Sequence, residues 1–440
     1  MLRRFYSIAA STSTTSARNA SQLNNKLFLN NKAKLVDSKI NFNIQTVSQN
    51  FKDINDDRKS IEIALDAKEP INTWTKEQIK EIYDTPLHDL IFASQIQHRR
   101  FHKPSEIQFC TLLSIKTGGC TEDCKYCAQS SKNPTGLKAE KMIDIETVKE
   151  KARMAKDRGS TRFCMGAAWR DMTGRKSGLR KIGEMVKYIN EDLKMETCVT
   201  LGMIGKEQLS HLKESGLTAY NHNVDTSREH YPKIITTRKY DERLETIKNV
   251  QDTGIKVCSG GILGLGETEQ DHVSFLYTLA TLDHHPESLP INRLVAIKGT
   301  PIEKELAENV DENGKMKKLK FESIIKTIAT ARLIMPKSII RLAAGRYTMK
   351  ESEQLLAFMT GCNAIFTGEK MLTTMCNGWD EDTEMLAKWG FKPMESFTGS
   401  LLNSESEAQP ETAAAAKSAA SPEVARQDPQ VEQQPLAASG

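Results

Sequence analysis

The chain has 440 residues, of which 38% are hydrophobic and 27% charged, a composition typical of a globular protein and not of a wholly disordered one. No apolar stretch approaches the roughly 20 residues that a membrane-spanning helix needs, so no membrane association is expected. The formal net charge is +4, but residues 1–36 hold six basic residues and no acidic one, which leaves −2 for the remainder. This distribution argues against nucleic acid as a partner.

Residues 1–36 have the composition of an organelle-targeting segment. They carry arginines, are rich in Ser, Thr and Asn, and lack acidic residues, as mitochondrial transit peptides do. A secretory signal would need an unbroken apolar core, whereas residues 5–10 run directly into a Ser/Thr-rich stretch. A disordered terminus is the alternative. We therefore expect a mitochondrial transit peptide leading to the matrix.

Two further stretches lie outside the predicted folded domain. Residues 37–75 are polar with scattered apolar positions, and no structure is predicted for them. Residues 399–440 consist largely of Ser, Glu, Ala, Pro and Gln. Such a tail cannot bury enough apolar surface to offset its ordering entropy, so it is predicted to be disordered. The folded domain is expected to span residues 76–398.

Within that domain, short apolar or β-branched segments alternate with amphipathic ones. The predicted strands are 109–115, 161–166, 195–201, 217–222, 255–262, 289–296, 338–344 and 363–367. Helical spacing of apolar residues appears in 179–193, 241–253 and 321–335. Gly254 is expected to end the second of these helices, and Pro336 the third. Thr268 with Asp271 resembles a capping box that begins a further helix.

Eight such βα units in this length predict an α/β protein with a (β/α)8 TIM-type barrel, flanked by disordered N- and C-terminal extensions. A doubly wound open sheet is the alternative. It would normally carry a glycine-rich phosphate turn after its first strand. The chain lacks that turn, because Glu269 stands where Gly264-Leu265-Gly266 would need a further glycine.

Three cysteines with metal-ligand spacing, Cys120, Cys124 and Cys127, follow the first predicted strand. A structural zinc site usually has four protein ligands, and no fourth Cys or His lies nearby. Three thiolates on a four-iron cluster would leave one iron open to a substrate. The spacing therefore favours an iron–sulfur cluster, with zinc as the alternative.

This CxxxCxxC sequence after a first barrel strand resembles the radical S-adenosylmethionine (SAM) superfamily. Longer phrases resemble the biotin synthase family within it, in the same order along residues 77–393. These phrases are 113–120 (LSIKTGGC), 160–169 (STRFCMGAAW), 220–226 (YNHNVDT), 256–261 (KVCSGG), 290–292 (PIN) and 341–346 (RLAAGR). The mitochondrial eukaryotic type is implied by the N-terminal segment.

The resemblance implies two iron–sulfur clusters. Cys120, Cys124 and Cys127 would hold a [4Fe–4S] cluster. A [2Fe–2S] cluster would be held by Cys164, Cys198, Cys258 and Arg341. From residue type alone the three strand cysteines would be buried apolar side chains, and Arg341 a carboxylate or phosphate clamp. The remaining cysteines, Cys110, Cys362 and Cys376, match no ligand position and are expected to be core or surface thiols.

The resemblance also implies where small molecules bind. SAM would meet Asn223 and Asp225 through its ribose and Arg243 through its carboxylate, and it would lie against the backbone near Tyr126, Ala167 and Ile262. For the substrate dethiobiotin, the implied contacts are Asn223 and Asn292 with the ureido ring and Thr373 and Thr374 with the carboxylate. From residue type alone, these polar residues would close turns or flank helices.

The implied activity is that of a radical SAM sulfurtransferase, which inserts sulfur from the [2Fe–2S] cluster into dethiobiotin to form biotin. The expected partners are a ferredoxin-type electron donor, iron–sulfur assembly proteins and a second copy in a homodimer. A methylornithine-type mutase or a hydrogenase-maturation enzyme would not require the second ligand set. Lipoyl synthase would need a second tight cysteine triad, which is absent. A non-catalytic zinc or RNA-binding protein is the alternative from another class.

Overall fold

The computed structural model describes residues 59–309 and 319–396. The predicted transit peptide 1–36 and the predicted disordered tail 399–440 therefore lie outside the described residues, as do residues 37–58 of the polar extension.

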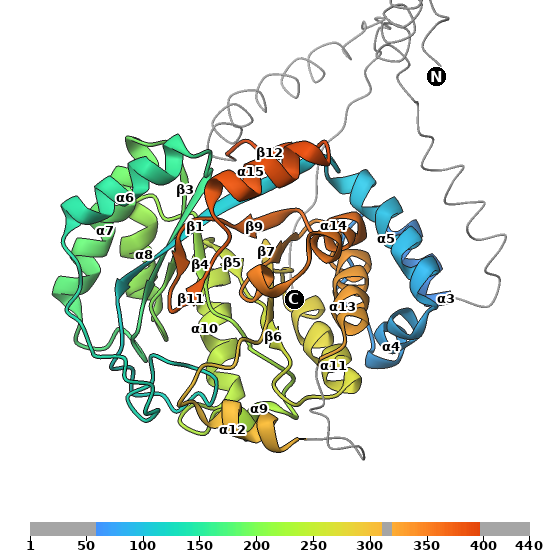
Figure 1. Ribbon diagram of the computed structural model, residues 1–440, viewed down its shortest axis with the longest axis horizontal. Helices are drawn as coiled ribbons and strands as arrows, with labels where there is room; N and C mark the ends of the chain where they lie inside the picture. Colours follow the sequence, from blue (N-terminus) through green and yellow to red (C-terminus); the bar gives the residue numbers. More distant parts are fainter. Residues whose placement is uncertain (1–58, 310–318, 397–440) are drawn as a thin grey trace, which may run out of the picture. The chain divides into compact units, whose positions relative to one another are not determined.

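Eight parallel strands form a closed barrel at the centre of the described body (Figure 1). Strand β9 pairs with β1 as well as with β8, and this pairing closes the ring. The predicted (β/α)8 barrel is thereby confirmed, and the open-sheet alternative is wrong. The strands are β1 (Glu106–Lys116), β2 (Arg162–Ala167), β3 (Glu196–Thr200), β4 (Ala219–Asn221), β5 (Lys256–Cys258), β7 (Ser288–Arg293), β8 (Ile339–Leu342) and β9 (Ala364–Phe366).

The fifth predicted strand, 255–262, is interrupted in the structure. It divides into β5 and a short β6 (Gly261–Leu263), which also pairs with β7. The interruption lies at Ser259 and Gly260. A Cβ atom on Gly260 would lie 1.9 Å from the carbonyl oxygen of Pro290, so only glycine permits this close approach of backbone to backbone.

The predicted helices are confirmed, with ends shifted by a few residues. Helix α10 stops at Asp252, and Gly254 follows with a φ of 71°, the left-handed conformation of a helix-ending glycine. The capping box of Thr268 and Asp271 begins α11. The helices that cover the barrel are α6 (Ile145–Asp157), α7 (Lys176–Glu191), α8 (Lys206–Glu214), α10 (Tyr240–Asp252), α11 (Glu269–Ala280), α13 (Phe321–Ile334) and α14 (Glu351–Thr360).

Among the described residues, three helices precede the barrel: α3 (Lys59–Asp66), α4 (Lys76–Asp84) and α5 (Leu87–Phe101). Helix α3 falls in the stretch for which no structure was predicted. It buries Ile61, Ala64 and Leu65 and contacts α4, α5 and α13. The folded body of the described residues thus begins before residue 76, on the side of the barrel that carries α13 (Figure 1).

The chain adds a small C-terminal layer after β9. It contains the antiparallel hairpin β10 (Lys370–Met371) and β11 (Thr374–Met375), helix α15 (Trp379–Lys388) and β12 (Lys392–Pro393), which pairs with the start of β1. Two short helices, α9 (Tyr231–Ile234) and α12 (Pro301–Glu308), lie at the opposite edge of the view in Figure 1.

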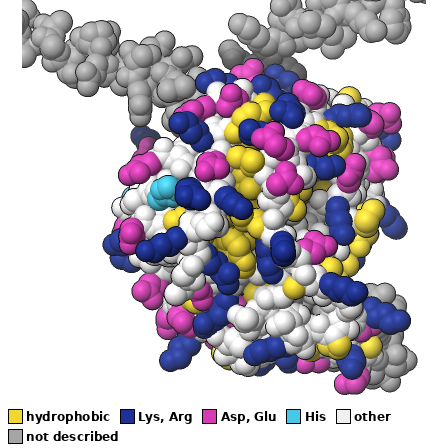
Figure 2. Space-filling view, turned by 90° about the vertical axis from the view of Figure 1, so that its left-hand side faces the viewer, with side chains coloured by type: hydrophobic (Ala, Val, Ile, Leu, Met, Phe, Trp, Pro, Cys, Tyr) yellow, Lys and Arg dark blue, Asp and Glu magenta, His cyan; other side chains and the backbone are white. Residues whose placement is uncertain are grey.

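Charges of both signs are interspersed on the face shown in Figure 2, where a narrow band of hydrophobic side chains runs between them. Neither sign forms a continuous stripe on that face. Across the described part of the chain, no helix has both the length and the apolar character to cross a bilayer.

Candidate active site

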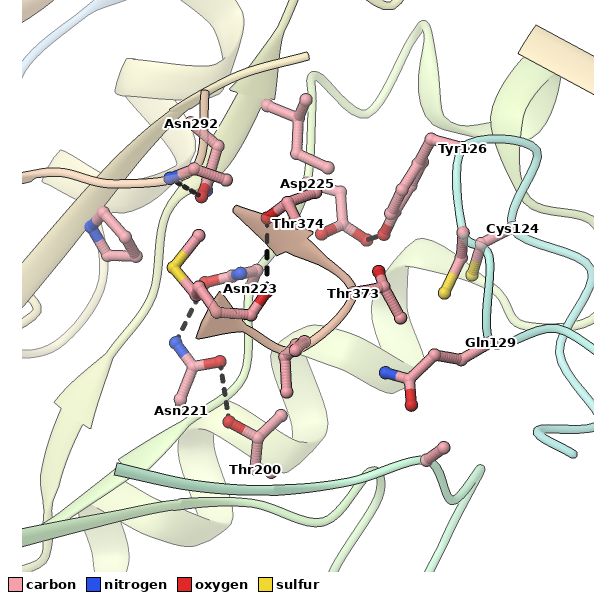
Figure 3. Close-up of a pocket in the computed structure, with 18 of the residues that line it drawn as sticks. Cys124, Tyr126, Gln129, Thr200, Asn221, Asn223, Asp225, Asn292, Thr373 and Thr374 are labelled. Carbon is pink, nitrogen blue, oxygen red and sulfur yellow. Dashed lines mark hydrogen bonds between the residues drawn. The ribbon is translucent and has the colours of Figure 1, made fainter. Parts of the chain in front are cut away.

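One cavity of about 340 Å³ lies at the carboxyl ends of the barrel strands, where barrels of this kind form their sites (Figure 3). The loop after β1, the ends of several strands and the β10–β11 hairpin line it. With the exception of Arg341, every residue singled out from the sequence for a site lines this cavity: Cys120, Cys124, Tyr126, Cys127, Cys164, Ala167, Cys198, Asn223, Asp225, Arg243, Cys258, Ile262, Asn292, Thr373 and Thr374.

The loop that carries Cys120, Cys124 and Cys127 is held by its own backbone and by one amide. Asn133 Nδ2 donates hydrogen bonds to the carbonyl oxygens of Cys124 (3.0 Å) and Cys127 (2.8 Å). Burial raises the pKa of all three thiols, and that of Cys127 to about 11. These thiols are therefore protonated at neutral pH until a bound metal displaces the protons.

Two acidic side chains between these cysteines tie the loop to the rest of the barrel. Glu122 forms ion pairs with Arg238 (2.9 Å) and Arg170 (3.0 Å). Asp123 accepts hydrogen bonds from the backbone N–H groups of Thr236 (3.0 Å) and Thr237 (3.2 Å). Although partial burial opposes its charge, these bonds hold the pKa of Asp123 at about 2. These contacts of Glu122 and Asp123 were not predicted from the sequence. The signal that could have indicated them is the presence of two acidic residues inside the CxxxCxxC motif.

The cysteines of this loop suit a cluster better than one ion. Among residues 59–309 and 319–396, no three His, Cys, Asp or Glu side chains are grouped so as to hold a single metal ion. A four-iron cluster bonds each of its cysteines to a different iron, so its thiolates do not need to converge on one point. The zinc alternative is accordingly not supported by this geometry.

The second set of cysteines lies inside the barrel. Cys164 on β2 is in direct register with Cys198 on β3, and Cys258 ends β5. The Cys198 thiol hydrogen-bonds with both neighbours; the contact with Cys164 and burial raise its pKa, and the contact with Cys258 opposes this rise. All three are free thiols, and Leu112 and Phe366 pack against them. Three reduced thiols in contact in an apolar pocket are a donor set that fits an iron–sulfur cluster.

Arg341 lies beside these thiols but is fully buried and does not line the cavity. Its guanidinium donates to Gln108 Oε1 (2.7 Å) and Ser288 Oγ (2.6 Å), and its Nη1 lies 3.9 Å from Cys258 Sγ. None of these partners is a carboxylate, so the interpretation as an anion clamp has no support here. Arg341 Nε is buried without a hydrogen-bond partner.

The three cysteines without a predicted role lie in different surroundings. Cys110 contacts Arg341, with 3.1 Å between Cys110 Sγ and Arg341 Nη2, so it adjoins the second thiol set. Cys362 is a buried core thiol, as expected. The Cys376 thiol donates to the backbone oxygen of Phe366 at 3.1 Å.

Asp225 is the centre of a charged group at the cavity wall. It has a φ of 69°, a strained conformation for a residue other than glycine. Its carboxylate accepts a hydrogen bond from the Tyr126 hydroxyl (2.9 Å) and pairs with Arg243 (2.6 Å). Burial works against the charge of Arg243, but Asp225 and its other neighbours hold the pKa of this guanidinium above its usual value. Arg243 also donates to the carbonyl oxygen of Asn223 at 2.7 Å.

Two amide side chains on neighbouring parts of the cavity have fixed orientations. Asn223 Oδ1 accepts from Asn221 Nδ2 (3.1 Å) and from the backbone N–H of Gly260 (3.1 Å). The group left for a ligand is therefore the Nδ2 donor. Asn292 donates from Nδ2 to Gly261 O (2.8 Å) and accepts from the N–H of Ala344 (3.0 Å), which retains one N–H for a ligand. Both amides thus offer donors to the cavity.

Sequence reasoning missed Asn221, the last residue of β4, which also lines the cavity. It hydrogen-bonds with Thr200, Asn223 and Cys258 (Figure 3 shows the first two of these contacts). The available signal was its spacing of two residues from Asn223, because alternate residues of a strand share one face.

Thr373 and Thr374 reach the cavity from the β10–β11 hairpin (Figure 3). Thr374 Oγ1 donates to the carbonyl oxygen of Met371 at 3.2 Å. Leu372 in the same turn has a φ of 51°, and its side chain packs over Gly166 of β2. The hairpin thereby brings two hydroxyl groups to the cavity from outside the barrel strands.

Comparisons with known proteins agree with this fold. The sequence profile of the radical SAM superfamily matches residues 114–276, and that of the Biotin and Thiamin Synthesis associated domain matches residues 290–392. The barrel superposes on methylornithine synthase with a TM-score of 0.60 at 17% identity, covering 78% of this chain and 98% of that one. For the FeFe-hydrogenase maturase of Carboxydothermus hydrogenoformans the TM-score is 0.62 at 15% identity, over 80% and 81% of the two chains. These likenesses show the fold alone.

The sequence relatives are much closer. The mitochondrial biotin synthase of Saccharomyces cerevisiae is 65% identical over 338 residues, which are 77% of this chain and 88% of that one. The mitochondrial biotin synthase of Arabidopsis thaliana is 53% identical over 324 residues, or 74% and 82% of the two chains.

A barrel with CxxxCxxC after its first strand, matched by the superfamily profile, defines a radical SAM enzyme, with SAM and a [4Fe–4S] cluster as its cofactors. Within that superfamily, the chain belongs to the biotin synthase family.

Proposed function

We propose that this chain converts dethiobiotin to biotin by inserting sulfur taken from an auxiliary [2Fe–2S] cluster. The observation that carries the proposal is that two separate groups of three thiols line the same cavity, together with the amide side chains of Asn221, Asn223 and Asn292. A single cluster would need only one such group. The identity of 65% to a curated biotin synthase supports the same activity.

The first group of thiols, Cys120, Cys124 and Cys127, would hold the [4Fe–4S] cluster. Asn223, Asp225 and Arg243 would orient SAM beside it through the ribose and the carboxylate. In the structure Arg243 and Asp225 are already paired at 2.6 Å, so this part of the wall is preorganised. The backbone near Tyr126, Ala167 and Ile262 would complete the SAM site.

The second group, Cys164, Cys198 and Cys258, would hold the [2Fe–2S] cluster together with Arg341. An arginine normally keeps its protons and offers no lone pair. In its favour, Arg341 has a buried Nε without a partner and an Nη1 only 3.9 Å from Cys258 Sγ. When bound, the four-iron cluster and SAM supply a 5′-deoxyadenosyl radical for hydrogen removal, and the two-iron cluster supplies the sulfur atom.

The substrate would lie between the two thiol groups. The N–H donors of Asn223 and Asn292 suit the ureido carbonyl oxygen of dethiobiotin, since the oxygen atoms of both amides are engaged by protein donors. Thr373 and Thr374 would receive the substrate carboxylate at the hairpin.

The expected partners follow from this chemistry. Loss of sulfur would consume the second cluster, so iron–sulfur assembly proteins would be needed to rebuild it. A ferredoxin-type electron donor would supply the electron for the cleavage of SAM. A homodimer is also proposed. We place the protein in the mitochondrion, on the composition of residues 1–36 and the mitochondrial names of the yeast and plant relatives, and within it in the matrix.

The direct experiment is anaerobic incubation of the reconstituted protein with SAM, reductant and dethiobiotin. We expect 5′-deoxyadenosine and biotin to form together. If both clusters are loaded and biotin does not form, the proposed function is wrong.

The assignment of Arg341 has its own experiment, iron and sulfide analysis of the reconstituted Arg341→Met variant. Methionine removes the nitrogen ligand while keeping much of the buried volume. We expect the variant to lose the iron that belongs to the [2Fe–2S] cluster and to keep the iron of the [4Fe–4S] cluster. An unaltered iron content and visible spectrum would remove Arg341 from the ligand set.

A further inference from the structure

Asn221 joins the two halves of the cavity through a chain of hydrogen bonds. Thr200 at the end of β3 donates from Oγ1 to Asn221 Oδ1 at 3.1 Å. A hydroxyl can donate or accept, so the orientation of the amide follows from its other side. There the backbone oxygen of Cys258 can only accept, so Nδ2 faces it and the oxygen faces Thr200 (Figure 3).

On that opposite side Asn221 Nδ2 meets three acceptors. It lies 3.1 Å from Asn223 Oδ1, 3.2 Å from the backbone oxygen of Cys258 and 3.3 Å from Cys258 Sγ. An amide has two N–H groups, so the two acceptors on Cys258 share one of them. A thiolate is a stronger acceptor than a thiol because it is charged, and the contact with sulfur is therefore favoured once Cys258 ligates iron.

The same amide thus touches a residue of the sulfur site and a residue of the substrate site. Cys258 belongs to the group of buried thiols inside the barrel. Asn223 lines the cavity, with its oxygen held by Asn221 and by Gly260 so that its N–H donors remain for a ligand. Without the Asn221 side chain, the contact with Cys258 Sγ is lost and Asn223 Oδ1 keeps only the hydrogen bond from Gly260.

We propose that Asn221 is a positioning residue that sets the reduction potential of the auxiliary cluster through an N–H···S bond to Cys258 and holds Asn223 in its donor orientation toward the substrate. The inference rests on the proposed function, since it needs a cluster on Cys258. Hydrogen bonds to ligand sulfur stabilise the reduced, more negative state of a cluster. Removing the bond should therefore make the cluster harder to reduce.

The experiment compares the midpoint potentials of the two clusters, by anaerobic redox titration followed by EPR and visible spectroscopy, in four reconstituted proteins. They are the wild type, Asn221→Ala, Asn221→Asp and Asn292→Ala. Aspartate keeps the size of the side chain and lacks both N–H donors. Asn292→Ala is the matched control, because Asn292 lines the same cavity and its hydrogen bonds go to Gly261 and Ala344 and not to a cysteine.

In both Asn221 variants we expect the midpoint potential of the [2Fe–2S] cluster to become more negative and that of the [4Fe–4S] cluster to stay unchanged. In Asn292→Ala we expect neither midpoint potential to shift. KM for dethiobiotin should rise in Asn221→Ala, because Asn223 is then free to turn. Loss of the auxiliary cluster alone, with the first cluster and the fold retained, would also support the role.

Wild-type potentials in both Asn221 variants would overturn the inference. So would loss of the fold in both, judged by circular dichroism, because Asn221 would then be a general folding residue. The proposed function has a separate failure. If the wild-type protein takes up the [4Fe–4S] cluster but no second cluster, the proposed function itself is wrong, whatever the Asn221 variants show.

Discussion

Glu122 and Arg238 form an ion pair of 2.9 Å with side chains only 6% and 4% exposed, and this pair joins the loop of the first three cysteines to the segment before α10. Arg170 adds a second guanidinium to the same carboxylate oxygen at 3.0 Å. Thr237 also donates to Glu122 through its hydroxyl. The loop that must hold three thiols in one place is thus fixed by a buried charge cluster and not by its own backbone alone.

Glu122→Gln should destabilise the protein by about 3 kcal/mol, because it leaves the buried guanidinium of Arg238 without a carboxylate. The loop would lose its fixed position, so incorporation of the [4Fe–4S] cluster should fall as well. Urea unfolding of the apo protein and iron content after reconstitution measure the two effects. Lys125→Ala is the control, since it removes the partly exposed Lys125–Glu305 pair of the same loop and should cost less than about 1 kcal/mol. Equal losses in both variants would contradict the anchoring role.

Gly260→Ala should disturb the barrel where the fifth strand is interrupted. The new Cβ would lie 1.9 Å from the backbone oxygen of Pro290, and backbone cannot move aside as a flexible side chain can. We expect a drop in Tm and reduced loading of the cluster on neighbouring Cys258. Gly205→Ala, at a helix start with its nearest neighbour 3.9 Å away, should change Tm little. Thermal unfolding of both variants tests this, and a wild-type Tm for Gly260→Ala would contradict it.

Asp382→Asn should destabilise the C-terminal layer. Arg346 and Asp382 form a two-point ion pair, at 2.7 Å and 2.6 Å, with both side chains almost fully buried. Removing one charge leaves the other unpaired in the interior, at a cost on the order of 3–5 kcal/mol. The neighbouring pair of Arg158 with Asp380 is exposed, so Asp380→Asn should cost less than about 1 kcal/mol. Urea unfolding curves of the two variants would refute the prediction if their midpoints coincide.

Glu267 should make stability depend on pH in the acid range. Burial works against its charge, but the hydrogen bonds from His272 (2.9 Å) and the backbone N–H of Gly264 (2.6 Å) hold the pKa of Glu267 below its ordinary value. A lowered carboxyl pKa stabilises the fold above the ordinary value, and the contribution is lost as pH falls through the folded value. Glu267→Gln should therefore lower Tm near pH 7, with the difference from wild type shrinking below about pH 4. Parallel Tm curves over that range would show that the carboxylate contributes nothing.

The barrel was predictable because each of its units is local. The apolar spacing of 179–193 and the caps at Gly254 and Thr268 depend on residues within one or two turns of each other, and the structure confirms them. Helix α3 was missed because its short apolar stripe becomes informative only when it packs on α4, α5 and α13. The break in the fifth strand was missed because it depends on Pro290, thirty residues away along the chain.

The candidate site was likewise predictable only in part. Residue type and spacing alone indicated a metal cluster on Cys120, Cys124 and Cys127, and the resemblance to a family supplied the remaining candidates. Which hydrogen bonds each of them makes could not be predicted. The donor orientation of Asn223, the role of Asn221 and the contact of Cys110 with Arg341 all join residues on different strands.

Local order along the chain was enough to establish the class of fold and the family, and to single out six cysteines as candidate cluster ligands. A parallel barrel brings residues together by the register between strands, and register is a property of the closed ring and not of any one segment. The pairing of Cys164 with Cys198, the burial of Arg341 away from the cavity and the contacts of Asn221 with both Cys258 and Asn223 therefore emerged with the folded barrel.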